Sequence, residues 1–166
     1  MSATGPNQGH ILTKRLYYTN KNIAGTAINE QLKIGYAVCF DYANAAPGET
    51  ANRGRCVHKC ETANANCFAG IVTACSQLPT TSGGVVNGDA GWIEVAYEAD
   101  SIDAWLHANT TVNTTVLKPA NGQWYMDAAA TSGLDTPAEI FNVAAVALET
   151  HDSSTTSATK RVRLIK

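Results

Sequence analysis

Apolar and polar residues alternate along several short stretches of this chain. Residues 92–98 place Ile93, Val95 and Tyr97 on one side, with Glu94 and Glu98 on the other. Residues 35–41 repeat the same period of two. Such alternation is typical of strands with one face in a core, because successive side chains of a strand point in opposite directions. Both stretches are therefore predicted to be β-strands.

Two stretches near the C-terminus predict a hairpin. Residues 141–149 are apolar at both alternations, which is typical of a strand covered on two sides. Residues 160–166 place Val162 and Leu164 on one face and Arg161, Arg163 and Ile165 on the other, and a Ser/Thr-rich tract joins the two arms. A small barrel has only one interior, so a strand over residues 141–149 with two apolar faces predicts a second covering partner, such as another copy of the chain.

The remaining runs complete an all-β pattern. Strand-like stretches recur roughly every ten residues without a long amphipathic helix, which predicts a small antiparallel β-barrel or sandwich. Residues 101–108 fit either one helical turn or a continuing strand, and residues 26–32 carry only Ile28 and Leu32 as apolar positions. Asn121-Gly122 is a strong short turn signal. The other strand-like runs are residues 10–18, 55–60, 67–75, 110–117 and 123–126.

The N-terminal region differs from the rest of the chain. Residues 1–9 contain Gly5, Pro6 and Gly9 and show no periodicity, so residues 1–18 are predicted to form an extended arm before a β-barrel domain over residues 19–166. Ordering such an arm requires contacts, either with a partner or with its own barrel. We expect the partner contact, for example by addition of a strand to a neighbouring sheet. The candidate interface residues are His10, Ile11, Leu12, Tyr17, Tyr18 and Trp105.

Composition and charge narrow the classes of function. Charged residues make up 16% of the 166 residues and the net charge is −2, which argues against a nucleic-acid-binding protein with its clustered Lys and Arg. No apolar run approaches the ~20 residues of a membrane helix. The first residues do not follow the pattern of a secretory signal. We expect a protein that is synthesised in a cytoplasm and has no membrane or nucleic-acid partner.

Five cysteines are the first candidates for chemistry. Cys56, His58, Cys60 and Cys67 resemble a zinc-ligand set, but alternate residues of a strand lie about 7 Å apart, too far to share one ion without a bend. We expect no metal and reduced cysteines that act as small core residues. The alternative is one disulfide between the neighbouring strands that carry residues 56–60 and 67–75.

Signals for catalysis are weak. The chain has no nucleophile-elbow motif, and Gly83-Gly84 precedes no convincing helix that would cradle a phosphate. Glu94, Glu98 and Asp100 are spaced as the outward face of a strand and the turn after it. The three Trp residues are more typical of core or interface anchors than of sugar platforms. We therefore expect no enzyme activity, no catalytic residues and no cofactor.

The order of segments over residues 24–166 follows a definite series. An opening strand is followed by a polar turn, a small-residue strand, a Trp-containing strand and a closing C-terminal hairpin. The residues of this series are 32–38, 57–59, 64–72, 91–96, 116–122, 142–149 and 162–165. In this order of segments the chain resembles phage capsid decoration (cement) proteins of the small β-barrel type.

The resemblance implies a virion structural protein. Such proteins bind the outer surface of the phage head through the major capsid protein, stabilise the shell and form homotrimers. The alternatives are another virion β-domain subunit, such as a head fibre base or a tail component, and a carbohydrate-binding module.

Overall fold

The chain folds almost entirely into β-strands. The computed structural model describes residues 10–28, 30–50, 54–61, 67–75, 80–82, 85–87, 90–120, 122–129, 143–152 and 157–165. Within these ranges every regular element is a strand, which confirms the all-β prediction. The strands are β1 (Ile11–Tyr18), β2 (Ala37–Asp41), β3 (Cys56–Lys59), β4 (Phe68–Cys75), β5 (Thr80–Ser82), β6 (Val85–Asn87), β7 (Gly91–Leu106), β8 (Val116–Pro119), β9 (Met126–Ala128), β10 (Ala145–Ala147) and β11 (Ala158–Leu164).

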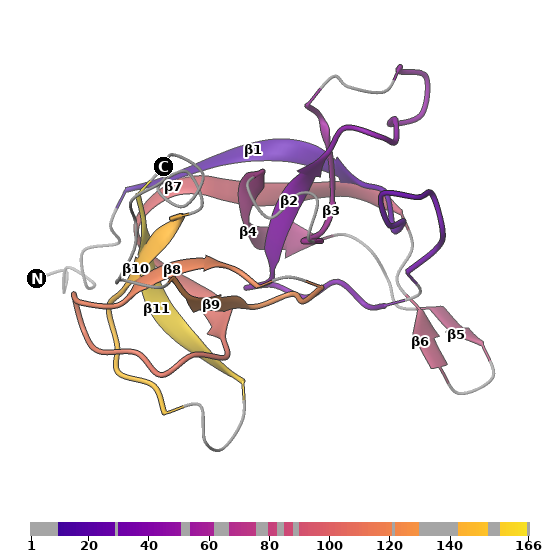
Figure 1. The fold of residues 1–166 in the computed structure, drawn as a ribbon. Coiled ribbons are helices and arrows are strands. Elements are labelled where there is room, and N and C mark those ends of the chain that lie inside the picture. The colour runs from indigo at the N-terminus through magenta and orange to yellow at the C-terminus, as the bar shows by residue number, and fades with distance from the viewer. Residues whose placement is uncertain are drawn as a thin grey trace, which may run out of the picture.

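Nine of these strands form one sheet that closes on itself twice. The sheet order is β1-β3-β2-β4-β7-β11-β10-β8-β9, and two additional pairings join β1 to β7 and β7 to β9. The first circuit therefore consists of β1, β3, β2, β4 and β7, and the second consists of β7, β11, β10, β8 and β9. Most pairings are antiparallel, whereas β1–β3 and β7–β9 are parallel. In Figure 1 the long strands β1 and β7 run side by side, and β8 to β11 gather at one end of them.

Strand β7 belongs to both circuits because it is 16 residues long. Its N-terminal half pairs with β1 through Leu16↔Ile93 and with β4 through Val72↔Val95. Its C-terminal half pairs with β11 through Val162↔Ile102 and reaches β9 at Leu106↔Met126. Ala99 pairs with both Ile11 and Leu164, so it marks the point where β7 passes from one circuit to the other.

Each circuit encloses its own apolar core. The first core holds Leu16, Tyr18, Leu32, Val38, Val57, Ala69, Val72, Ile93, Val95 and Trp124. The second core holds Ala37, Phe68, Ile71, Ala96, Ala99, Ala104, Leu106, Leu117, Met126, Ala144, Ala145, Ala147, Val162 and Leu164. Residues from β2 and β4 thus occur in both, since one face of these strands covers the first core and the other face covers part of the second.

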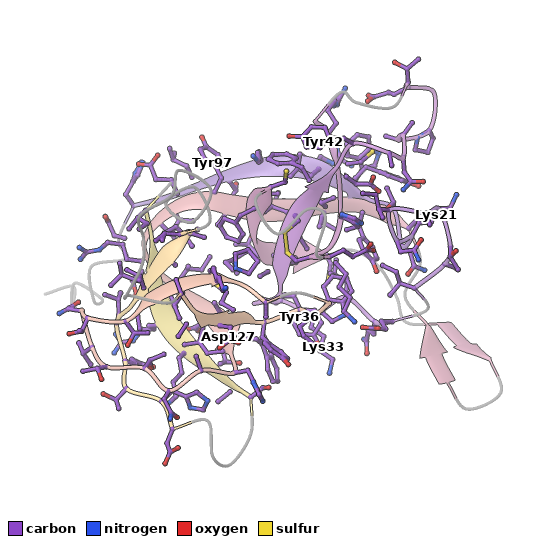
Figure 2. The ribbon with its side chains drawn as sticks, viewed as in Figure 1. Lys21, Lys33, Tyr36, Tyr42, Tyr97 and Asp127 are labelled. Carbon is purple, nitrogen blue, oxygen red and sulfur yellow. A yellow bond between two sulfur atoms is a disulfide. The ribbon has the colours of Figure 1, made fainter. Side chains whose placement is uncertain are left out.

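A seam of aromatic residues joins the two circuits. Gly35 donates its N–H to the Val72 carbonyl at 2.9 Å and accepts a hydrogen bond from the Trp105 N–H at 3.0 Å. The Tyr36 ring stacks on Trp124, with ring centroids 5.3 Å apart, and meets the edge of Trp105 at 5.9 Å. Figure 2 shows Tyr36 between the two groups of strands. A Cβ at Gly35 would lie 3.0 Å from the Trp105 ring, so this close approach favours glycine.

Several predicted elements are confirmed and others are corrected. The C-terminal hairpin forms as predicted, with Ala147↔Val162 paired. Residues 101–106 continue β7 as a strand, one of the two predicted alternatives. In the predicted strand 110–117, only Val116 and Leu117 belong to β8, because residues 112–114 form a turn in which Asn113 adopts a positive φ. Residues 26–28 and 30–32 contain no strand, although Leu32 is buried.

The second part of the predicted arm over residues 1–18 is a strand of the sheet. Ile11–Tyr18 forms β1 and pairs with β7 along its whole length. These residues therefore pair with their own sheet, where β7 satisfies their backbone hydrogen bonds. This agrees with the alternative in which the arm contacts its own barrel and not a partner. Residues 1–9 of the predicted arm lie outside the described residues.

Candidate docking surface

The structure separates the six predicted interface residues. Tyr18 is fully buried in the first core, so it has no surface to offer a partner, which corrects its assignment. Trp105 is half-buried in the aromatic seam, where it packs on Tyr36. His10 and Ile11 are exposed near the start of β1, and Leu12 is half-buried. Tyr17 is half-buried and belongs to a cluster on the outer face of the first circuit.

This cluster is centred on Trp92. The Tyr17 ring meets Trp92 edge to face, with centroids 5.4 Å apart. The guanidinium carbons of Arg15 and Arg55 lie 5.3 and 5.4 Å from the centroid of the Trp92 ring. Guanidinium groups at this distance are attracted by the negative face of an indole. We refer to Arg15, Tyr17, Arg55, Trp92 and Glu94 as the outer patch.

Strand register explains how these residues meet. Tyr17 and Trp92 are direct partners across β1 and β7, and so are Arg15 and Glu94. Arg55 joins them because the Tyr17 N–H donates to its carbonyl at 2.8 Å at the start of β3. Sequence analysis missed Arg15, Arg55 and Trp92 as members of one site. The period of two places Arg15 with Tyr17 and Trp92 with Glu94, but the pairing of the two strands is not encoded in either stretch alone.

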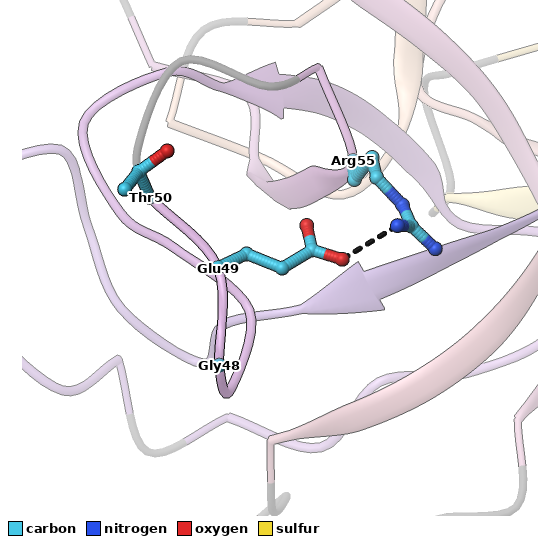
Figure 3. A pocket seen from close by; sticks show the side chains of 4 residues that line it. All are labelled: Gly48, Glu49, Thr50 and Arg55. Carbon is cyan, nitrogen blue, oxygen red and sulfur yellow. Dashed lines mark hydrogen bonds and ion pairs between the residues drawn. The ribbon is translucent and has the colours of Figure 1, made fainter.

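Three pockets lie around the outer patch. A pocket of about 220 Å³ is lined by Arg15, Ala74, Trp92, Ile93 and Glu94. A second pocket of about 280 Å³ has Tyr17, Thr19 and Lys21 in its wall. The third, of about 500 Å³, is lined by Gly48, Glu49, Thr50 and Arg55. Figure 3 shows the Glu49 carboxylate directed at the Arg55 guanidinium in this pocket, and the two groups are 2.5 Å apart.

The charges of the patch are incompletely paired. Arg55 is neutralised by Glu49, whereas Arg15 and Glu94 are both exposed and form no ion pair within the described part of the chain. The Arg15 guanidinium lies over the Trp92 ring instead. On the other face of β1, the Lys14 ammonium lies 4.4 Å from the Phe40 centroid, and burial lowers the pKa of Lys14. Among the described residues, Arg15 and Glu94 are thus the two charged groups of the outer patch without an ion-pair partner.

A buried carboxylate anchors the loop that leads to Arg55. Asp41, at the end of β2, is 1% exposed. It accepts hydrogen bonds from the backbone N–H groups of Ala43 and Asn44 at 2.9 Å, from the Asn44 side chain at 2.8 Å and from the Thr19 hydroxyl at 3.1 Å. Four donors satisfy the carboxylate oxygens, which makes its burial tolerable.

The cysteines require a correction. Cys39 of β2 and Cys60, which follows β3, form a disulfide, with Cα atoms 5.1 Å apart. The prediction that all five cysteines are reduced is wrong, and so is the alternative pairing between the strands of residues 56–60 and 67–75. Cys39 and Cys60 approach because β2 and β3 pair with Cys39 opposite His58. Cys56, Cys67 and Cys75 are free thiols, and burial raises the pKa of Cys56 and of Cys75.

The two apolar faces of strand β10 are covered mostly by other parts of the same chain. Ala144, Ala145 and Ala147 are fully buried, while Val146 and Leu148 are half-buried. Residues of both alternations are therefore covered largely by the chain itself. A second copy of the chain is not needed to account for the apolar pattern of residues 143–148.

Within the described residues, no group of three or more His, Cys, Asp or Glu side chains is arranged to hold a metal ion. The same part of the chain contains no helix that is long and apolar enough to cross a membrane. No protein-family model, curated protein or solved structure matches this chain.

Proposed function

We propose that the chain is a capsid decoration (cement) protein that binds the outer surface of a phage head through the major capsid protein and stabilises the shell. The observation that carries this proposal is the doubly closed sheet, in which one long strand ties two circuits into a single body. A body of this kind resists deformation, because bending it requires the separation of paired strands in both circuits. Resistance to deformation is the property that a brace between shell subunits requires.

The outer patch is the surface that we propose for contact with neighbouring proteins on the virion, including other copies of this chain. Trp, Tyr and Arg are the residue types that contribute most to protein–protein binding energy. Trp92, Tyr17 and Arg15 occur together on the outer face of β1 and β7, and Arg55 joins them from the start of β3. Self-association into a homotrimer belongs to the same proposal, as the family resemblance implies, although β10 no longer provides an independent argument for it.

Binding to empty shells tests the proposed function. The purified protein is mixed with shells of the virus that encodes it, and co-sedimentation and the rupture temperature of the shells are measured. We expect saturable binding and a higher rupture temperature. The Trp92→Ala variant should bind more weakly, whereas Lys33→Ala, at an exposed site outside the outer patch, should bind like the wild type.

Two outcomes would overturn the proposal. Binding to isolated tail tubes or fibres without binding to shells would favour another virion β-domain subunit. Binding to a glycan array without binding to any virion part would favour a carbohydrate-binding module.

A further inference from the structure

The outer patch has a charge arrangement that matches a reversed copy of itself. Arg15 and Glu94 stand directly opposite each other on β1 and β7, both are exposed, and neither forms an ion pair in the described residues. A uniformly acidic or basic partner would find one favourable and one unfavourable charge there. A second copy related by a two-fold axis presents the same pair in reverse order, so both charges are matched.

We propose that the outer patch is a two-fold contact between copies of this chain, in which Arg15 of each copy pairs with Glu94 of the other. A two-fold interface uses the same surface on both copies, which requires this kind of self-complementarity. The Trp92 ring, half-buried between Arg15 and Arg55, becomes the shared apolar centre of the contact. The pocket of about 220 Å³ beside it accommodates the guanidinium group of the partner's Arg15 next to Glu94.

The charge pattern also discriminates against other occupants. Two carboxylates lie at the outer patch: Glu94 stands beside Arg15, and Glu49 pairs with Arg55. A nucleic acid on the patch would bring its phosphates close to both, and like charges in proximity repel. An acidic peptide would meet the same two carboxylates. The contact proposed here needs only one cation and one carboxylate from each copy.

The setting of this contact rests on the proposed function. On a shell surface, a two-fold contact would link neighbouring decoration units, whether these are single chains or trimers. The contact itself is a property of the isolated protein, so it can be tested without shells.

Complementary charge reversals test the proposal. Arg15→Glu and Glu94→Arg are prepared as separate proteins, and association is measured by analytical ultracentrifugation at roughly 1 μM to 1 mM, the range in which weak contacts are populated. The wild type should associate with rising concentration, and added salt should weaken this association. Each single variant should lose at least tenfold in association constant, because two identical charges would then face each other across the axis.

A mixture of the two variants provides the decisive measurement. Arg15→Glu chains carry two carboxylates in the patch and Glu94→Arg chains carry two cations, so mixed pairs match both charges. The mixture should recover association at the wild-type level although every chain still carries its own substitution. The matched control is the mixture of Arg163→Glu with Asp103→Arg, which makes the same charge changes at exposed sites on β11 and on the C-terminal half of β7. Each control variant alone should associate like the wild type.

Several results would overturn the inference. One is a wild-type molecular mass that stays constant over the concentration range. Another is an association constant of the mixture that is no higher than those of the two separate variants. Wild-type binding to a glutamate-rich peptide or to an oligothymidine, without self-association, would assign the patch to an acidic protein or to nucleic acid instead. Circular dichroism shows whether each variant is folded. If a variant does not fold, the concentration dependence of the mass of the wild type alone tests the proposal. Shell binding by a protein that fails these tests would leave the proposed function standing.

Discussion

A Cβ atom at Gly70 would lie 2.0 Å from the carbonyl oxygen of Ala96, on the strand next to β4 in the sheet. Gly70 also has a φ of +145°, which side chains rarely adopt. The backbones of β4 and β7 therefore approach each other at a point where no side chain fits.

We expect Gly70→Ala to destabilise the protein by about 3 kcal/mol or more, since overpacking and backbone strain act together. Urea unfolding of the purified variant measures the loss. The control is Gly122→Ala, where φ is +68° but nothing lies within 4 Å of the added Cβ. That change should lower the free energy of unfolding by only about 1 kcal/mol, from backbone strain alone. Equal losses at the two sites would show that the close approach to Ala96 has no energetic effect.

Asp41→Ala should destabilise the protein by about 3 kcal/mol, because it removes the acceptor of four hydrogen bonds from a buried site. The loop after β2 should also become more sensitive to proteolysis, since two of the donors belong to its backbone. Limited proteolysis and urea unfolding measure the two effects. Asp127→Ala is the matched control, because the Asp127 side chain is only half-buried and accepts one exposed hydrogen bond, from the backbone N–H of Ala128. A loss at Asp41 no larger than at Asp127 would contradict the anchoring role.

The Cys39–Cys60 disulfide should contribute about 3 kcal/mol to the free energy of unfolding, the value typical of a loop of its length, 21 residues. The double variant Cys39→Ala/Cys60→Ala should unfold at lower urea concentration than the oxidised wild type. A reducing agent should lower the stability of the wild type and leave that of the double variant unchanged. Cys75→Ala, at a free thiol, should retain the response to the reducing agent. Peptide mapping without reduction should recover residues 39 and 60 in one linked pair.

The ion pair between Glu149 and Arg161 predicts a small dependence of stability on acid. The Arg161 side chain donates to the Glu149 carboxylate at 2.6 Å and holds the pKa of Glu149 below its ordinary value of 4.5. A lowered pKa in the folded state means that the contribution is present above the ordinary pKa and is lost as the pH falls through the folded value. Since both groups are partly exposed, the contribution should be about 0.5 kcal/mol or less.

Comparison with Glu149→Gln isolates this effect. The difference in free energy of unfolding between the wild type and the variant should be constant from neutral pH down to about pH 5 and should shrink below it. A difference that grows on acidification would show that the pair opposes folding.

The strands were predictable because their side chains alternate. Ile93 and Val95 are buried and Glu94 is exposed, as the period of two predicts, and the C-terminal hairpin follows the same logic. Residues 101–106 were ambiguous in sequence because Ser101, Asp103 and Trp105, which alternate with the apolar positions, differ from one another in polarity. Tertiary pairing with β11 decides the matter in favour of a strand.

Features that depend on contacts between distant strands were not predictable. The Cys39–Cys60 disulfide depends on the register of β2 against β3, and the outer patch depends on the register of β1 against β7. Neither register is encoded within a single strand. Tyr18 was assigned to an interface because it is one of the apolar residues of the predicted arm, but the period of two places it with Leu16 on the core side of β1.

The position of β7 in both circuits constrains how this protein can evolve by recombination. An exchange of segments between related genes can replace a module only if the module keeps its own paired strands. Here the junction between the halves lies inside one uninterrupted strand, at Ala99, where residues from both circuits meet the same backbone. A crossover there would join two half-strands whose partners were selected in different ancestors, so viable hybrids should inherit β7 whole, together with at least one complete circuit.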